Sequence, residues 1–273
     1  MSDIPSLYVL AKQCLDCCDP VKKVELTHFY ARQWNDGLIT LQKEAEPQKI
    51  EDPGRPQKPE LVHPSKVTKR KINTEQGRQA LIHAICHIEF NAINLAWDAV
   101  YRFRDMPEQF YSDWIKVADE EAYHFSLLLQ RLQELGSNYG EFSAHNGLWE
   151  MACKTDYDVM VRMALVPRVL EARGLDVTPG MMQRLSSAGD KRSLKLLEII
   201  LRDEVGHVAI GSHWFKYLCE QRGLDAEQTF IDLLDKYMKG YVKGPFYEQA
   251  RLDAGFSENE LLMLKQQAGQ YEK

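Results

Sequence analysis

The chain has 273 residues, of which 44% are hydrophobic, so it is long enough to bury a sizeable core. Its net charge of -6, from 34 basic and 40 acidic residues, provides no general electrostatic attraction to nucleic acid. The N-terminus has no basic stretch followed by an apolar run, and no segment is apolar over the roughly 18 residues that a membrane span requires. We therefore expect a soluble, cytoplasmic protein with no membrane contact.

Two amphipathic helices are expected near the N-terminus, over residues 4–18 and 21–41. Between Pro47 and Pro64, five prolines and Gly54 exclude a helix and predict an extended segment. The densest basic run of the chain, Lys66 to Lys71, follows it. We predict that residues 1–73 pack on a helical bundle.

Four long helices are predicted to form that bundle within residues 74–240. Their expected bounds are about 74–103, 107–135, 156–173 and 191–221. Pro167 predicts a kink in the third helix, just before Glu171. Further helices near 226–239 and 258–267 complete the chain, and we assign residues 241–273 to a C-terminal helical extension.

One arrangement of acidic residues and histidine occurs twice in the predicted helices. A Glu is followed after 32 or 33 residues by Glu-x-x-His, as Glu89 with Glu121-Ala-Tyr-His124 and as Glu171 with Glu204-Val-Gly-His207. Because residues three apart project from the same face of a helix, the Glu and His of each motif can reach one point together. The pattern predicts two helical hairpins that each offer three metal ligands.

The Glu-x-x-His motif occurs at two other places, which we discount. Glu60 and His63 lie between prolines, where a helix cannot present both side chains, and Glu25 and His28 have no mirrored partner. The two retained motifs are each preceded by a further acid, Glu120 or Asp203. A metal-bound imidazole donates its second N–H to such an acceptor, so we expect these two carboxylates to orient the histidines.

The six predicted ligands are four carboxylates and two imidazoles, a set found in ferritin-like dinuclear carboxylate proteins. Such a set suits iron or manganese, whereas structural zinc more often recruits thiolate. We predict two metal ions, iron in the first place, with manganese or a mixed pair as alternatives. No catalytic residue is assigned beyond the ligands.

Several stretches resemble an uncharacterised bacterial ferritin-like group, catalogued only as a domain of unknown function. They are Pro53-Gly-Arg-Pro56, His87-Ile-Glu89, Glu120-Glu-Ala-Tyr-His-Phe125, Leu170-Glu-Ala-Arg-Gly-Leu-Asp176 and Asp203-Glu-Val-Gly-His-Val208. The resemblance implies an all-α fold, a ferritin-like four-helix bundle with additional N- and C-terminal helices. It also implies membership of the di-iron carboxylate superfamily, with a dinuclear iron site.

The leading functional hypothesis is an oxidoreductase that activates dioxygen and oxidises or hydroxylates a small molecule or a modified base. An iron-handling protein and a purely structural metal site are the alternatives. A more distant similarity to a ferritin-like tRNA hydroxylase adds a third. In that case a weak RNA contact would run through four basic residues, which are Lys66, Lys69, Arg70 and Lys71.

Overall fold

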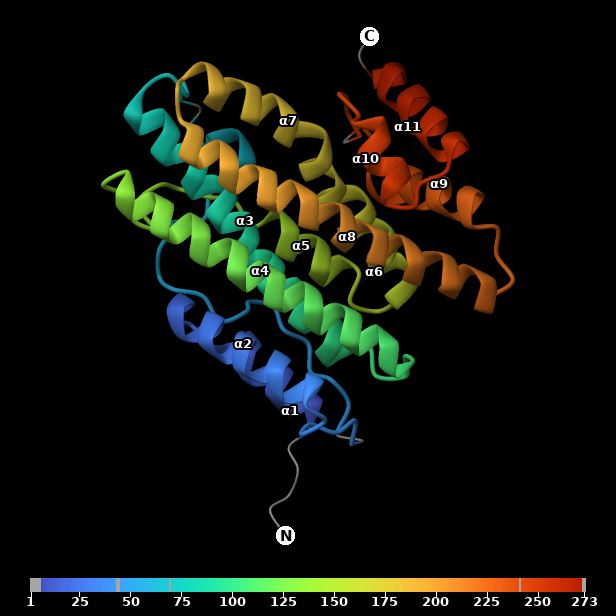
Figure 1. Cartoon of the computed structure of the whole chain (residues 1–273). Coiled ribbons are helices and arrows are strands. Elements are labelled where there is room, and N and C mark those ends of the chain that lie inside the picture. Colours follow the sequence, from blue (N-terminus) through green and yellow to red (C-terminus); the bar gives the residue numbers. More distant parts are fainter. Residues whose placement is uncertain (1–5, 43–44, 69, 241, 272–273) are drawn as a thin grey trace. The chain divides into compact units, whose positions relative to one another are not determined.

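The computed structural model describes residues 6–42, 45–68, 70–240 and 242–271, which form an all-α fold without a β-strand in these ranges, as predicted (Figure 1). The chain divides into two compact units, residues 1–153 and 154–273. This boundary falls between the two predicted hairpins, and the predicted division at 73 and 240 stays a prediction. Within the described ranges, none of the helices has the length and apolar character that crossing a membrane would require.

The first unit is built around a hairpin of two long helices, α3 and α4, on which α1 and α2 pack. Its helices are α1 (Leu7–Asp16), α2 (Pro20–Asn35), the short 3₁₀ turn η1 (Pro64–Lys66), α3 (Glu75–Arg102), α4 (Glu108–Glu134) and α5 (Gly147–Lys154), which ends at the boundary. The hydroxyl of Thr74 accepts a hydrogen bond from the Gly77 amide at 3.0 Å, so α3 begins at the predicted cap. α4 also has the predicted bounds within a residue.

The second helix is shorter than predicted. It ends at Asn35 rather than near residue 41, because Gly37 adopts a φ of 70°, a left-handed conformation that terminates helices. The chain then returns to the start of α1, where the Leu7 amide donates to the Thr40 carbonyl at 2.9 Å. The predicted start of α1 at residue 4 lies outside the described residues.

The proline-rich segment contains no helix between residues 47 and 63, as predicted. It is fastened to the end of the first unit by Trp149 of α5, a helix that the sequence did not predict. The indole N–H of Trp149 donates to the Glu51 carbonyl at 2.8 Å, and its side chain is fully buried. The segment is therefore an ordered part of the first unit.

His83 of α3 is a buried, neutral hydrogen-bond acceptor in this unit. Its Nε2 accepts the Gly140 amide at 2.9 Å, and its ring stacks on Tyr139 with 5.5 Å between centroids. Burial lowers the pKa of His83 to about 4, although the nearby Glu141 opposes this shift. The side chain therefore stays uncharged at pH values where an exposed histidine binds a proton.

We expect His83 to make the protein acid-sensitive. Between its ordinary pKa of 6.5 and its folded value of about 4, the unfolded chain binds a proton at this residue that the folded chain does not. The free energy of unfolding should fall by roughly 1–3 kcal/mol as the pH drops through that window. Urea unfolding at pH 7.0 and 4.5 should show a smaller loss for His83→Gln, which keeps an acceptor. His213→Gln, at an exposed site, is the control, and an equal loss in all three proteins would contradict the assignment.

The second unit contains the helices of the second predicted hairpin and three shorter ones. They are α6 (Val159–Leu165), the π-helical segment η2 (Val166–Glu171), α7 (Ala172–Ser187), α8 (Lys191–Gln221), α9 (Ala226–Tyr237), α10 (Glu248–Asp253) and α11 (Glu258–Tyr271). The bounds of α8 agree with the prediction. The third predicted helix is longer than expected: it continues through η2 and α7 to Ser187, past Gly174 and Pro179. The sequence did not predict α10.

The predicted kink at Pro167 is a π-helical segment that packs against α8. Proline has no N–H for the helical hydrogen-bond ladder, and the wider turn of a π-helix accommodates this gap. α8 presents Gly211 to the proline ring, where an added Cβ would lie closer than 3.0 Å to Cβ and Cγ of Pro167. Gly211 thus allows the close approach of η2, which ends at Glu171.

A fully buried arginine joins η2 to the C-terminal helices of the same unit. Arg168 donates to Oε1 of Glu260 at 2.6 Å, and both side chains have no exposed surface. Its guanidinium lies over three aromatic rings, at 4.8 Å from the centroid of Phe215, 4.2 Å from Phe230 and 4.4 Å from Phe256. The charge is therefore paired by a carboxylate and stabilised by the ring faces.

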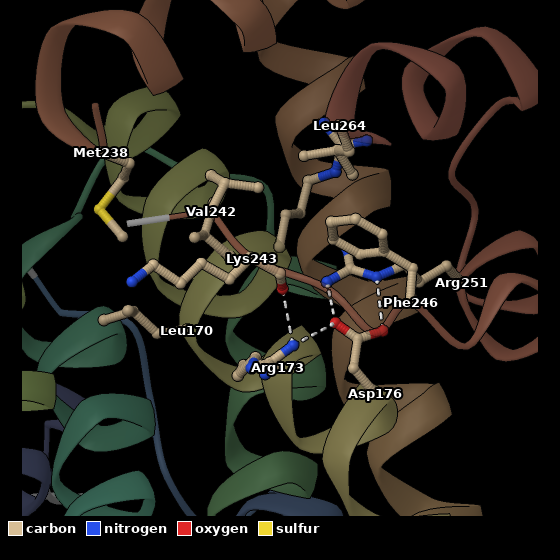
Figure 2. A pocket seen from close by; sticks show the side chains of 11 residues that line it. Leu170, Arg173, Asp176, Met238, Val242, Lys243, Phe246, Arg251 and Leu264 are labelled. Atoms are coloured by element: carbon tan, nitrogen blue, oxygen red, sulfur yellow. Dashed lines mark hydrogen bonds and ion pairs between the residues drawn. The ribbon is translucent and has the colours of Figure 1, made fainter. Parts of the chain in front are cut away.

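A second buried pair fastens α10 to α7 (Figure 2). Arg251 donates from Nε and Nη2 to the two carboxylate oxygens of Asp176, at 2.9 and 2.7 Å. The Tyr247 amide donates to Oδ1 of the same carboxylate at 2.9 Å. These charge-assisted bonds fix the C-terminal helices against the hairpin of the second unit.

Candidate metal centre

In the first unit, the structure brings together the three ligands predicted from its hairpin. Glu89 comes from α3, and Glu121 and His124 come from one face of α4. Nδ1 of His124 lies 3.3 Å from Oε2 of Glu89 and 3.5 Å from Oε2 of Glu121. One potential ligand atom of each residue lies within 4.8 Å of the others. All three side chains are buried, with 0% exposure at Glu121 and His124.

In this cluster, three ionisable side chains lie close together in a buried site. Burial raises the pKa of Glu89, and the charge of Glu121 raises it further. Burial alone would lower the pKa of His124, but Glu121 and Glu89 shift it strongly upward. Two carboxylates at such a site are costly unless a cation accompanies them.

The donor set of the first unit fits a divalent metal ion. Oε2 of Glu89 is a buried carboxylate oxygen that faces His124, with 3.3 Å between it and Nδ1. Buried carboxylate oxygens beside an imidazole nitrogen are ligands for such ions. A bound ion would displace protons from Glu89 and His124, because metal ligands must be deprotonated.

In the second unit, Glu204 and His207 lie together on α8. Oε1 of Glu204 is 3.6 Å from Nδ1 of His207, whose side chain is fully buried. Glu171 is buried at the end of η2, a segment that packs against α8. The structure thus places these three predicted ligands on neighbouring elements of one unit. Whether all six act together stays a prediction.

The acids that precede the two motifs have local partners. Glu120 accepts a hydrogen bond from Lys116 at 2.9 Å, one turn earlier on α4. Asp203 accepts from its neighbour Arg202 at 2.8 Å. Their predicted role in orienting the histidines stays a prediction.

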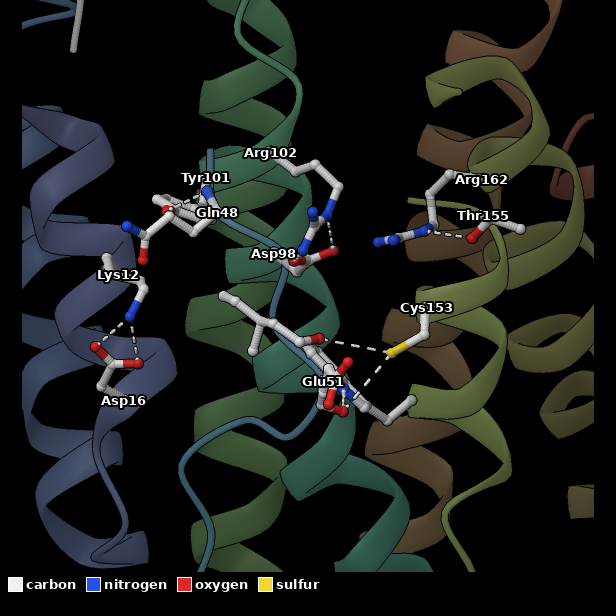
Figure 3. Close-up of polar contacts among 12 residues, drawn as sticks. Lys12, Asp16, Gln48, Glu51, Asp98, Tyr101, Arg102, Cys153, Thr155 and Arg162 are labelled. Carbon is white, nitrogen blue, oxygen red and sulfur yellow. Dashed lines mark hydrogen bonds and ion pairs between the residues drawn. The ribbon is translucent and has the colours of Figure 1, made fainter. Parts of the chain in front are cut away.

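Asp98 and Tyr101, which follow Glu89 on α3, make contacts away from it (Figure 3). Arg102 donates to the Asp98 carboxylate from Nε and Nη2, the shortest distance being 2.6 Å. The Tyr101 hydroxyl accepts the Gln48 amide at 2.9 Å. Tyr101 therefore anchors the proline-rich segment, and the ion pair stiffens the end of α3.

The predicted RNA contact is only partly within the described residues. Lys69 lies outside them. Arg70 lies over the ring of Phe142, with 4.9 Å between its guanidinium carbon and the ring centroid. Lys66 closes η1, and Lys71 is exposed. A role of these residues in RNA binding stays a prediction.

The sequence interpretation missed the charged residues that surround η2. Arg168, Arg173, Asp176 and Arg251 form its ion pairs and carbonyl contacts, yet none was singled out. Arg168 and Glu260 are 92 residues apart, and no local pattern links them. The sequence held one signal. Arg168, three residues before Glu171, lies among apolar residues in a pattern typical of a buried helix.

The fold and the cluster define an all-α protein with a buried carboxylate and imidazole site. The chain belongs to the family described as "Protein of unknown function (DUF455)", whose model matches residues 16–262. It is similar to an "Uncharacterized protein" of Haemophilus influenzae, 52% identical over 213 residues that cover 76% of this chain and 74% of the relative. No solved structure matches the chain.

Proposed function

We propose that this chain is a ferritin-like protein in which Glu89, Glu121, His124, Glu171, Glu204 and His207 hold two iron ions. The observation that carries the proposal is the buried arrangement of Glu89, Glu121 and His124, together with its repetition as Glu204 and His207 on α8. Surface charges have no reason to recur on the inner faces of helices. In the ferritin-like proteins that the sequence resembles, two such hairpins form one four-helix bundle with the six ligands pointing inward.

The proposed activity is the oxidation of an organic substrate with dioxygen. When bound by the six proposed ligands, a reduced iron pair would supply the electrons for oxygen activation, and the protein would supply ligand geometry and access. The buried carboxylates neutralise the charge of the metal ions. Pro167 and Gly211 position the segment that ends at Glu171.

The test combines metal binding with oxygen uptake in the full-length protein. Anaerobic titration should give two Fe(II) per chain and raise the melting temperature, because a ligand that binds only the folded state stabilises it. Air should then cause oxygen consumption. Glu121→Ala and His207→Ala should each bind less iron and lose most of the oxygen uptake.

The matched control uses the discounted motif on α2. Glu25 is exposed and has the same spacing to His28, so Glu25→Ala should keep both the iron stoichiometry and the oxygen uptake. Full iron binding by both ligand variants would refute the site. Iron binding without any oxygen consumption would refute the oxidoreductase and favour a structural metal. Oxygen uptake limited to the added Fe(II), without a substrate, would favour iron handling.

A further inference from the structure

The second unit contains a pocket of about 160 Å³ beside η2 (Figure 2). Six apolar side chains line it, from η2, the end of α9, the following loop and α11. They are Val169, Leu170, Met238, Val242, Phe246 and Leu264. An apolar cavity of about 150 Å³ can accept a benzene molecule. The pocket is therefore large enough for one compact apolar group.

More basic than acidic residues line this pocket. Arg173, Lys243 and Arg251 contribute three positive charges, whereas Asp176 contributes one negative charge. Asp176 accepts two hydrogen bonds from Arg251 and also lies 3.7 Å from Arg173, so one carboxylate serves two guanidinium groups. Arg168 also lines the pocket, but Glu260 balances its charge. The lining thus carries an excess of positive charge beside apolar walls.

The donors of Arg173 and Lys243 differ in what they already bind. Arg173 donates to the carbonyl oxygens of Lys243, Gly244 and Pro245, at 2.8, 3.2 and 3.0 Å, and so holds the loop in place. Within the described ranges, the ammonium group of Lys243 has no hydrogen-bond acceptor or acidic partner. Figure 2 shows its side chain extending across the pocket toward Leu170. This ammonium is therefore available to a ligand.

We propose that this pocket binds a small organic monocarboxylate whose apolar body is about the size of a benzene ring. The apolar walls take the body, and Lys243, supported by the field of Arg173, takes the carboxylate. A neutral molecule of the same shape would leave the excess charge unmatched. An anion without an apolar body would leave the walls exposed to water. Binding here needs no metal and is independent of the proposed oxidoreductase activity.

Benzoate is the probe, measured by isothermal titration calorimetry on the full-length protein. Benzoate should bind at least tenfold more tightly than benzamide, acetate or inorganic phosphate. Lys243→Gln should weaken benzoate binding about tenfold or more, as expected for the loss of a hydrogen bond to a charged group. Lys239→Gln, at an exposed site nearby, should leave it unchanged.

The outcomes that would overturn the proposal are distinct. Equal binding of benzoate and benzamide would mean that the charge is not used, and equal binding of phosphate would mean that the walls are not used. Benzoate binding that survives Lys243→Gln but is lost in metal-free protein would place the carboxylate at the metal centre instead. Because the calorimetry is also performed on metal-free protein, failure of the proposed iron site would leave this test intact.

Discussion

Replacement of Glu260 by Gln should lower the free energy of unfolding by about 3 kcal/mol, the lower end of the range for breaking a buried ion pair. The reason is that Arg168 would keep its charge in a site with no exposed surface and no carboxylate. Three aromatic faces soften this penalty but do not neutralise the charge. Urea unfolding followed by circular dichroism measures the change.

Glutamine can keep the other role of this residue, but its single carbonyl oxygen cannot also accept from Arg168, so the variant loses that hydrogen bond together with the charge. Oε2 of Glu260 accepts the Ser257 amide at 2.8 Å, while the Glu260 amide donates to the Ser257 hydroxyl at 3.0 Å. This reciprocal pair caps the start of α11, and Gln can serve there as well as Glu. The expected loss therefore reports the ion pair with Arg168 rather than the cap.

Two further variants separate the ion pair from ordinary effects of substitution. Glu258→Gln changes an exposed carboxylate on the same helix and should shift the free energy by no more than about 0.5 kcal/mol. In an Arg168→Met background, which removes the buried charge, Glu260→Gln should cost at least 2 kcal/mol less, an estimate from coupled buried pairs. An equal cost in both backgrounds would show that the pair does not stabilise the fold.

Replacement of Gly211 by Ala should destabilise the protein by about 1–3 kcal/mol, the range for overpacking a core. The added Cβ would fall within 3.0 Å of the Pro167 ring, a rigid group at the start of η2. Either α8 or η2 must then move. A movement of η2 would shift Glu171, which lies at its end. On the proposed function, this variant should also bind iron more weakly.

The same helix supplies the control for Gly211. At Gly206 an added Cβ would meet no atom within 4 Å, so Gly206→Ala should gain up to about 1 kcal/mol from helix propensity. Unfolding free energies of the two variants should thus differ by about 1–4 kcal/mol. If Gly211→Ala raised the free energy of unfolding, Pro167 would be able to move away without destabilising the protein.

The helices that carry the candidate site could be predicted because their ends are set by local signals. Thr74 caps α3, and Asp190 caps α8 by accepting the Ser193 amide at 3.0 Å. The extension of α7 to Ser187 could not be predicted, since Gly174 and Pro179 are residues that usually end helices. Packing of this helix on α8 outweighs that local preference.

Part of the candidate site could likewise be predicted from the sequence, and part could not. A carboxylate on an apolar helix face, such as Glu89, is unusual enough to be recognised from its pattern, and its Oε2 lies 3.3 Å from Nδ1 of His124. The pairs of Arg168 with Glu260 and Asp176 with Arg251 join positions 92 and 75 residues apart. No helical periodicity connects such positions, so the pocket that they border could not be predicted.

The pairing of Arg168 with Glu260 also sets the order in which parts of the chain can fold during synthesis. A ribosome makes Arg168 well before Glu260, and domains generally fold from the N-terminus as they emerge. The residues of the first unit have all been made by then, whereas the burial of Arg168 must wait for α11. The segment that ends at Glu171 is therefore completed only after α11 has been translated.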